Sequence, residues 1–180
     1  PNEIANLTQL HYLILCDNYL AELPNEITIL TNLQELDLTG NRLTALPKCF
    51  GELIQLQILY LSDNRLTELP ASISQLSNLK ILGLTRNRLT SCPEPLIQLC
   101  NIQELGLSEN NFKSLPNWLS RLSQLRKLGL ANTRLLEVPE WIGSLAELRD
   151  LYLGEEEGSI GRWGFSTTRS SNRLISLPNS

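Results

Sequence analysis

The stretch Leu33-Gln34-Glu35-Leu36-Asp37-Leu38-Thr39-Gly40-Asn41-Arg42-Leu43 decides the fold of this chain. Leucine stands at its first, fourth, sixth and last positions, and asparagine stands two residues before the end. The same arrangement returns 23 residues later at 56–66 and again at 79–89. Proline keeps the same period, at Pro1, Pro24, Pro47, Pro70, Pro93, Pro116 and Pro139, and again at Pro178 after one interruption. A fixed period of this length indicates a solenoid built from stacked copies of one unit.

Each copy predicts one short strand and one short helical segment. Leu36 and Leu38 alternate with Glu35 and Asp37, and a period of two is typical of a strand. The other half begins at proline and carries apolar residues at helical spacing, which are helix-start signals, with room for only a short α- or 3₁₀-helix. Strands pack about 4.8 Å apart, whereas helices prefer roughly 8–10 Å. The strands should therefore line the inside of a curve.

The sequence thus predicts an α/β fold. It is a right-handed solenoid, or horseshoe, with a concave parallel β-sheet and with short helices or 3₁₀ turns on the convex side. The whole chain, 1–180, is expected to be a single array of seven repeats. These run over 1–23, 24–46, 47–69, 70–92, 93–115, 116–138 and 139–177, the last with an insert at 155–170. Because the chain starts within a repeat and has no Met, we expect it to be part of a longer protein.

A polar column runs through this apolar pattern. It comprises Asn18, Asn41, Asn64, Asn87, Asn110 and Asn172, with Thr133 replacing Asn in the sixth copy. A side-chain amide offers two donors and an acceptor. Stacked amides are therefore predicted to form a structural ladder that satisfies the backbone of the turn after each strand. A buried amide left unpaired would cost roughly 1–3 kcal/mol.

With these motifs the chain resembles the leucine-rich repeat family over nearly all of its length. The repeat is similar to the 23-residue Leu-Pro type. That type is found in bacterial leucine-rich repeat proteins, Roco-type GTPases, Scribble- and Erbin-like scaffolds and plant intracellular Ras-group proteins. The resemblance implies a horseshoe fold and a role in binding other proteins.

Composition excludes several other classes of protein. Apolar residues make up 42% and charged residues 19% of the chain, as in a folded domain, and the net charge of −4 disfavours nucleic acid as a partner. No apolar run is long enough to span a membrane. The cysteines form no Cys-x-x-Cys pair and His11 is the sole histidine, so we expect no metal, no cofactor and no catalytic residue. The lack of paired cap cysteines favours a reducing, cytoplasmic location.

Outward strand positions are the candidate partner-binding residues on the concave face. They are Tyr12, Ile14, Glu35, Asp37, Ile58, Tyr60, Ile81, Gly83, Gly106, Lys127, Gly129 and Tyr152. The apolar members are expected to face solvent, and clustered exposed apolar groups mark binding sites. Gly83, Gly106 and Gly129 predict a shallow trough between Tyr60 and Tyr152, because strand glycines often mark close approach by another backbone. Recent copying of one repeat is the alternative explanation for the glycines.

Two further features lie outside the strands. An arginine file, Arg42, Arg65, Arg88, Arg134 and Arg173, follows the Asn column. It either meets acidic groups of a partner or pairs with neighbouring acids such as Asp63 or Glu109. The insert carries Arg162, Trp163 and Phe165 on a Gly-rich loop, which either contacts a partner at the concave rim or is a tolerated insertion.

The sequence therefore predicts a non-catalytic scaffold that binds another protein or peptide on its concave face. The alternative is a recognition or regulatory array of a larger enzyme, such as a Roco-like GTPase or a bacterial ubiquitin-ligase effector. Open sheet edges also make self-association through the edge strands possible.

Overall fold

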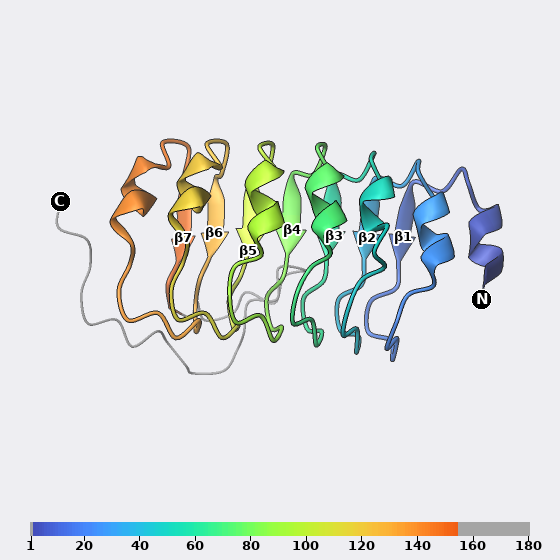
Figure 1. Ribbon diagram of the computed structural model, residues 1–180, viewed down its shortest axis with the longest axis horizontal. Helices are drawn as coiled ribbons and strands as arrows, with labels where there is room; N and C mark the ends of the chain where they lie inside the picture. Colours follow the sequence, from blue (N-terminus) through green and yellow to red (C-terminus); the bar gives the residue numbers. More distant parts are fainter. Residues whose placement is uncertain (1, 155–180) are drawn as a thin grey trace.

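The computed structural model describes residues 2–154, and each repeat in this range contributes one 3₁₀ helix followed by one strand (Figure 1). The 3₁₀ helices are η1 (Asn2–Asn6), η2 (Asn25–Ile29), η3 (Phe50–Glu52), η4 (Ala71–Gln75), η5 (Glu94–Gln98), η6 (Asn117–Arg121) and η7 (Glu140–Ser144). The strands are β1 (Tyr12–Ile14), β2 (Glu35–Asp37), β3 (Ile58–Tyr60), β4 (Ile81–Gly83), β5 (Glu104–Gly106), β6 (Lys127–Gly129) and β7 (Asp150–Tyr152).

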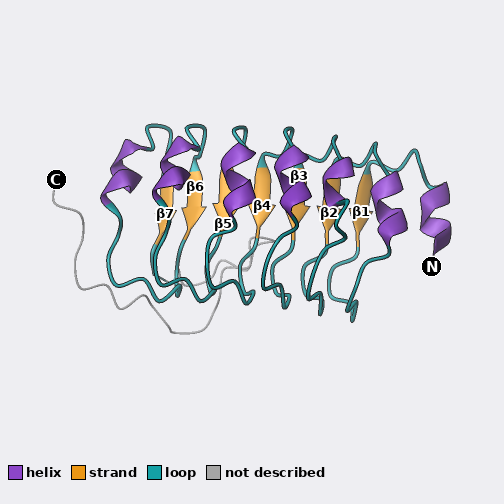
Figure 2. Ribbon diagram, in the orientation of Figure 1, coloured by secondary structure: helices purple, strands orange, loops and turns teal. Residues whose placement is uncertain are grey.

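The strands form one parallel sheet in chain order, β1 to β7. Every pair is in the same register, so that Leu36 lies opposite Leu59 and Leu59 lies opposite Leu82. The helices cover one side of the molecule and the sheet lines the other (Figure 2). The predicted α/β solenoid with a parallel sheet is confirmed, and the open choice between helix types is settled as 3₁₀ for the described repeats.

The core is a column of leucines between the sheet and the helices. Leu36 in β2 and Leu38 in the loop after it are fully buried. Leu30 and Leu33, which precede the strand, are fully buried as well. A fully buried side chain of this size stabilises the fold by roughly 1.5–3 kcal/mol before entropy is counted. Since no repeat can bury its leucines alone, each depends on the neighbours that cover its two faces.

Each described 3₁₀ helix has five residues or fewer. In η2, Pro24 caps the start with φ −66°, and the N–H of Leu30 closes the last turn on the Ile27 carbonyl at 3.2 Å. That closing bond spans three residues, as in a 3₁₀ helix. A turn follows, in which the Leu33 N–H donates to the Leu30 carbonyl at 2.9 Å, and β2 begins at Glu35.

The helices η3 and η4 pack backbone against backbone at Gly51. A Cβ on this residue would collide with the backbone carbonyl of Ser72. The Gly51 N–H donates a hydrogen bond to Ser72 Oγ at 3.2 Å, which also holds the two helices close together. The equivalent residue four repeats later is Gly143 in η7, where an added Cβ would meet nothing within 4 Å. The same residue type thus meets a tight environment in one repeat and an open one in another.

Cys92 belongs to the core, whereas Cys100 is exposed. Burial raises the pKa of the Cys92 thiol to about 12. At pH 8 only about one molecule in ten thousand would carry the reactive thiolate there. We expect iodoacetamide to alkylate Cys100 in the folded protein and Cys92 only after denaturant is added, as read by peptide mass spectrometry. Equal labelling of both residues without denaturant would contradict the burial of Cys92.

Candidate binding surface

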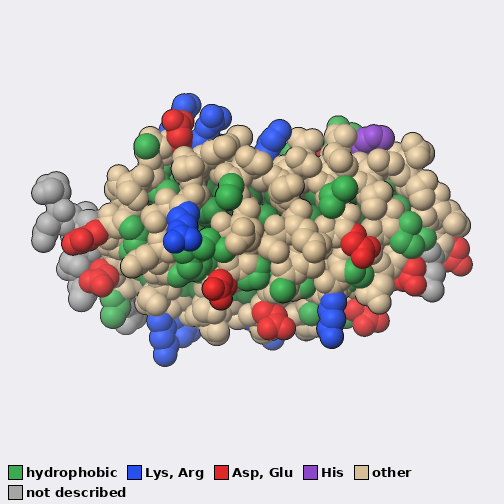
Figure 3. All heavy atoms as spheres, turned by 45° about the horizontal axis from the view of Figure 1, so that its top comes forward, with side chains coloured by type: hydrophobic (Ala, Val, Ile, Leu, Met, Phe, Trp, Pro, Cys, Tyr) green, Lys and Arg blue, Asp and Glu red, His purple; other side chains and the backbone are tan. Residues whose placement is uncertain are grey.

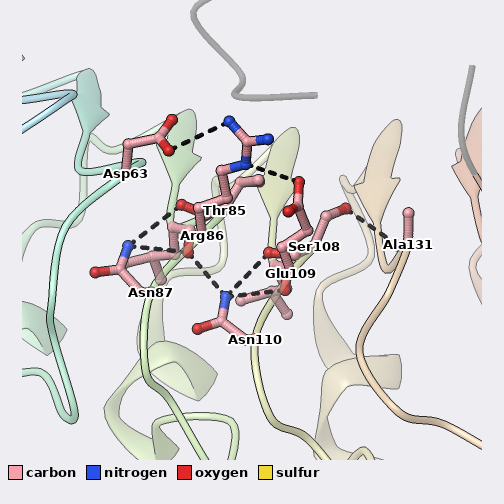
Figure 4. Close-up of polar contacts among 10 residues, drawn as sticks. Asp63, Thr85, Arg86, Asn87, Ser108, Glu109, Asn110 and Ala131 are labelled. Atoms are coloured by element: carbon pink, nitrogen blue, oxygen red, sulfur yellow. Dashed lines mark hydrogen bonds and ion pairs between the residues drawn. The ribbon is translucent and has the colours of Figure 1, made fainter. Parts of the chain in front are cut away.

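The asparagine ladder ties each repeat to the one before it (Figure 4). The Asn64 side chain accepts a hydrogen bond from the Leu43 N–H at 3.0 Å and donates to the Leu38 carbonyl at 2.9 Å, both in the preceding repeat. It also donates to Leu61 and Ser62 of its own turn at 3.1 and 3.2 Å. Asn41, Asn87 and Asn110 repeat this set of contacts.

The two ends of the ladder differ from its middle. Asn18 is exposed and donates only within its own turn, to the carbonyls of Leu15 and Cys16 at 3.0 Å each. Thr133 is buried, and its hydroxyl donates to the Leu130 carbonyl at 2.8 Å. Asn172 lies outside the described residues.

The residue before each ladder position adopts a left-handed backbone, which the sequence analysis did not predict. The φ angles are 53° at Asp17, 68° at Gly40, 54° at Asp63, 55° at Arg86, 53° at Glu109 and 53° at Asn132. This conformation costs a residue with a side chain some energy. The left-handed conformation directs the side-chain amide of the following ladder residue inward.

Three of these turn residues form a charge cluster along the edge where the strands end. Arg86 lies between Asp63, at 3.4 Å, and Glu109, at 3.0 Å (Figure 4). Burial lowers the pKa of Arg86, but the nearby Glu109 and Asp63 carboxylates together raise it by more, so the net shift is upward. Partial burial raises the pKa of Asp63 against the lowering effect of Arg86.

This cluster corrects the expected pairing of the arginine file. Asp63 and Glu109 are bound to Arg86, and not to Arg42, Arg65 or Arg88. The reason is geometric, since Arg86 shares the left-handed turn position with both acids and therefore lies in the same column. Arg42 instead places its guanidinium 4.5 Å from the centre of the Tyr19 ring.

On the outward face of the sheet, exposure is greatest at β1, which is the edge strand of the described sheet and has a neighbouring strand on one side only. Tyr12 is 62% and Ile14 is 45% exposed. The residues at the first position of β2 to β7 are half-buried: Glu35, Ile58, Ile81, Glu104, Lys127 and Asp150. Tyr152 of β7 is half-buried as well. Lys127 lies 3.6 Å from Glu104 on the neighbouring strand, so opposite charges meet across this part of the face.

The expectation of solvent-facing side chains is wrong for Tyr60 and Asp37. Tyr60 is only 7% exposed, because its ring lies against the adjacent Gly83: the ring Cδ1 is 3.3 Å from the place a Cβ would occupy there. Asp37 is 2% exposed, and its Oδ1 accepts a hydrogen bond from the Thr39 N–H at 2.9 Å. Both side chains turn along the sheet instead of away from it.

The three glycines lie side by side, as their register in β4, β5 and β6 shows. Gly83, however, is not part of an open trough walled by Tyr60, because the Tyr60 ring packs against that glycine. Gly106 and Gly129 are likewise buried. Glycine at position 83 therefore has a structural use, which is to admit a neighbouring aromatic ring.

The insert and the sole histidine are the remaining residues that the sequence singles out. The insert at 155–170, with Arg162, Trp163 and Phe165, lies outside the described residues. His11 is exposed beside β1. Within residues 2–154, no group of three metal-ligating side chains gathers, and no helix is long and apolar enough to cross a membrane.

A second amide ladder on the exposed side was missed. Asn32 donates to the Thr8 carbonyl at 2.9 Å, Asn78 to Ile54 at 2.9 Å and Asn101 to Ser77 at 2.8 Å. Gln124 continues the row by reaching Asn101 Oδ1 at 3.4 Å. The signal was available in the sequence, because Asn or Gln recurs at this position every 23 residues from Asn32 to Gln124.

Stacked units of strand, ladder turn and 3₁₀ helix, with a broad surface and a closed core, define a solenoid repeat protein. The chain belongs to the leucine-rich repeat family. Residues 1–80 match the model of a leucine-rich repeat region, and residues 54–112 and 77–135 match the model of a leucine rich repeat. A search of curated proteins found no match.

Solved structures share the fold. A leucine-rich repeat protein of Leptospira interrogans is 40% identical, with a TM-score of 0.83 over 86% of this chain and 39% of the other. An internalin of Listeria monocytogenes is 26% identical, with a TM-score of 0.77 over 99% of this chain and 50% of the other. The leucine-rich repeat ectodomain of the Arabidopsis thaliana receptor kinase GASSHO1/SCHENGEN3, solved in complex with CASPARIAN STRIP INTEGRITY FACTOR 2, is 32% identical. Its TM-score is 0.78, over 98% of this chain and 22% of the other.

The chain therefore spans half or less of each of these three solved chains. The fold they share is one commonly used as a protein-interaction scaffold.

Proposed function

We propose that this protein is a non-catalytic binding module that holds another protein or peptide on the outward face of its sheet. The observation that carries the proposal is the exposed apolar pair Tyr12 and Ile14 on β1. Clustered apolar groups of this kind mark interaction sites, and aromatic residues are frequent anchors in interfaces. The mixed charges of Glu104, Lys127 and Asp150 on β5 to β7 offer polar contacts further along the face.

The dimensions of the sheet support the proposal. Seven strands at about 4.8 Å spacing give a face roughly 30 Å long. A standard interface buries about 800 Å² on each partner, which a face of this length can provide. One of the similar structures is a plant receptor-kinase ectodomain solved in complex with CASPARIAN STRIP INTEGRITY FACTOR 2, which supports a role in binding another protein or peptide.

A second candidate is an array that recognises a substrate or regulates activity within a larger protein, such as a Roco-like GTPase or a ubiquitin-ligase effector. The observation that favours it is that the chain spans only 22–50% of the three solved chains. Under both candidate functions the array itself binds a partner protein, and they differ in whether an enzymatic domain acts on that partner. The free thiols at Cys16, Cys49, Cys92 and Cys100 support a reducing compartment.

The test is a quantitative pull-down with the full chain. The variant Tyr12→Ala plus Ile14→Asp should lose most of the partner captured by the parent, because an interface anchor becomes small and an apolar contact becomes charged. Loss of one such anchor typically costs about 2 kcal/mol or more of binding free energy. Ile54→Asp is the matched control, since Ile54 is 50% exposed but follows η3 on the opposite side.

Equal capture by the sheet variant and the parent, with Ile54→Asp reducing capture instead, would place binding on the helical side. Deletion of 155–170 in the same assay tests the insert. Retained melting temperature with lower capture would indicate that the insert contacts the partner, and unchanged capture would indicate a tolerated insertion.

A further inference from the structure

A row of arginines follows the asparagine ladder along the edge where the strands end. Arg42, Arg65 and Arg88 occupy the residue after the ladder asparagine in three consecutive repeats, and all three are exposed. Their backbone N–H groups donate to the carbonyls of Leu20, Leu43 and Leu66 at 2.8, 2.9 and 2.9 Å. These bonds hold neighbouring loops in register, so the three arginines, here called the arginine row, follow one another at roughly the 4.8 Å spacing of paired chains.

The arginine row takes no part in the ion pairs of the strand-end edge. Asp63 and Glu109 are bound to Arg86, and the Arg42 guanidinium lies 4.5 Å from the centre of the Tyr19 ring. In the range 2–154, no ion pair includes Arg42, Arg65 or Arg88. Like charges opposite one another on paired chains are destabilising. Arginines in three consecutive repeats thus form a positively charged patch on a protein whose net charge is −4. An acidic partner would reduce the repulsion between these charges.

A cleft lies immediately beside the arginine row on the same loops. It has a volume of about 480 Å³, in the usual range of ligand sites, and is lined by residues of the second, third and fourth repeats. Its apolar lining comes from Ala45, Leu46, Leu69 and Pro70, and its charged lining from Lys48 and Glu68. Ala45 and Glu68 each follow a row arginine by three residues, so the cleft and the row form one continuous surface.

The composition of the cleft limits what can enter it. Glu68 would repel a carboxylate placed inside, whereas the leucine, alanine and proline lining suits an apolar side chain. Carboxylates of the same partner would instead lie on the arginine row next to the cleft. Figure 3 shows both acidic and basic side chains along the lower margin of the molecule.

We propose that this edge is a second docking surface, which takes an acidic segment of a partner protein. Carboxylates of the segment contact Arg42, Arg65 and Arg88, and one apolar side chain enters the cleft between residues 45–48 and 68–72. This surface is separate from the outward face of the sheet. The inference therefore goes beyond the proposed function and does not depend on it.

The experiment measures fluorescence anisotropy of a labelled peptide titrated with the full chain. The peptide is a run of glutamates with one central leucine, about 12 residues long, enough to span row and cleft at about 3.3 Å per residue. We expect saturable binding that weakens as salt is raised. Arg65→Glu plus Arg88→Glu should weaken binding roughly tenfold, since exposed charge contacts contribute up to about 1 kcal/mol each and here two reverse sign.

Control variants separate this surface from the rest of the molecule. Arg121→Glu plus Arg126→Glu reverses two exposed arginines elsewhere and should leave the affinity unchanged. Tyr12→Ala plus Ile14→Asp should also leave it unchanged, so that failure of the proposed function and failure of this inference are distinguishable. Arg65→Gln plus Arg88→Gln, which only removes charge, should weaken binding less than reversal does. Melting temperatures establish that each variant is folded.

Several results would overturn the inference. They are no saturable binding at low salt, equal binding of a peptide with lysine in place of glutamate, and equal affinity for the row variant and the parent. Tighter binding of single-stranded DNA or of phosphatidylserine vesicles than of the peptide, lost in the same row variant, would assign the surface to another class of partner. A peptide with its leucine changed to glycine tests the cleft, and unchanged affinity would remove the cleft from the surface.

Discussion

Replacing Asn64 with Leu should lower the free energy of unfolding by about 4 kcal/mol. The side chain forms four hydrogen bonds, two of which reach the preceding repeat at Leu43 and Leu38. Leu is similar in size but can neither accept nor donate, so the buried Leu43 N–H is left unpaired, at roughly 1–3 kcal/mol. The Leu38 and Leu61 carbonyls keep Asn41 and Asn87 as donors but each lose one hydrogen bond, at about 1 kcal/mol each. The effect is measured by denaturant unfolding followed by circular dichroism.

Asn18→Leu is the matched control for this prediction. Asn18 holds the same place in its repeat, but it is exposed and binds only its own turn. Water can replace its contacts, so the expected loss is below about 1 kcal/mol. Equal denaturant midpoints for the two variants would contradict the prediction, because they would show that the hydrogen bonds between repeats do not stabilise the fold.

Replacing Gly51 with Ala should lower the free energy of unfolding by about 3 kcal/mol, as overpacking of a closed site does. The new methyl would collide with the backbone carbonyl of Ser72, and backbone cannot swing aside as a flexible side chain can. The helices η3 and η4 would have to move apart. The shift would also weaken the bond from the Gly51 N–H to Ser72 Oγ.

Gly143→Ala provides the comparison at the equivalent position four repeats later. An added methyl there meets nothing within 4 Å. Alanine reduces the freedom of the unfolded chain, so Gly143→Ala should be neutral or stabilising by up to about 1 kcal/mol. Opposite signs for the two substitutions are the expected result in thermal unfolding. A comparable loss at both positions would mean that glycine is needed for its backbone freedom and not for close packing.

The period of 23 residues was enough to predict the parallel sheet, its order and its leucine core. Alternation shows which residues point outward, because the geometry of a strand permits only two sides. It does not show what a side chain does after leaving the backbone. Tyr60 was therefore assigned to the correct face but to the wrong environment, since its ring lies against Gly83.

The left-handed turns show a second limit of prediction from sequence. Four of the six residues that adopt them before a ladder position, Asp17, Gly40, Asp63 and Asn132, are of types that favour this conformation. Arg86 and Glu109 are not, so residue preference gives only a partial signal. The pairing of Arg86 with Asp63 and Glu109 depends on that shared conformation, and it was missed for the same reason.

The contacts of the ladder reach back by fixed intervals, and this has a consequence for how such a protein can change in length. Asn87 binds the Leu66 N–H and the Leu61 carbonyl, which lie 21 and 26 residues before it. Asn110 binds Leu89 and Leu84 at the same intervals. If the unit 70–92 were excised, Asn110 would inherit the two partners of Asn87 without any rearrangement. Gene duplication or loss of whole units can thus lengthen or shorten the array, and with it both proposed binding surfaces, while the ladder bonds across each joint keep the same intervals.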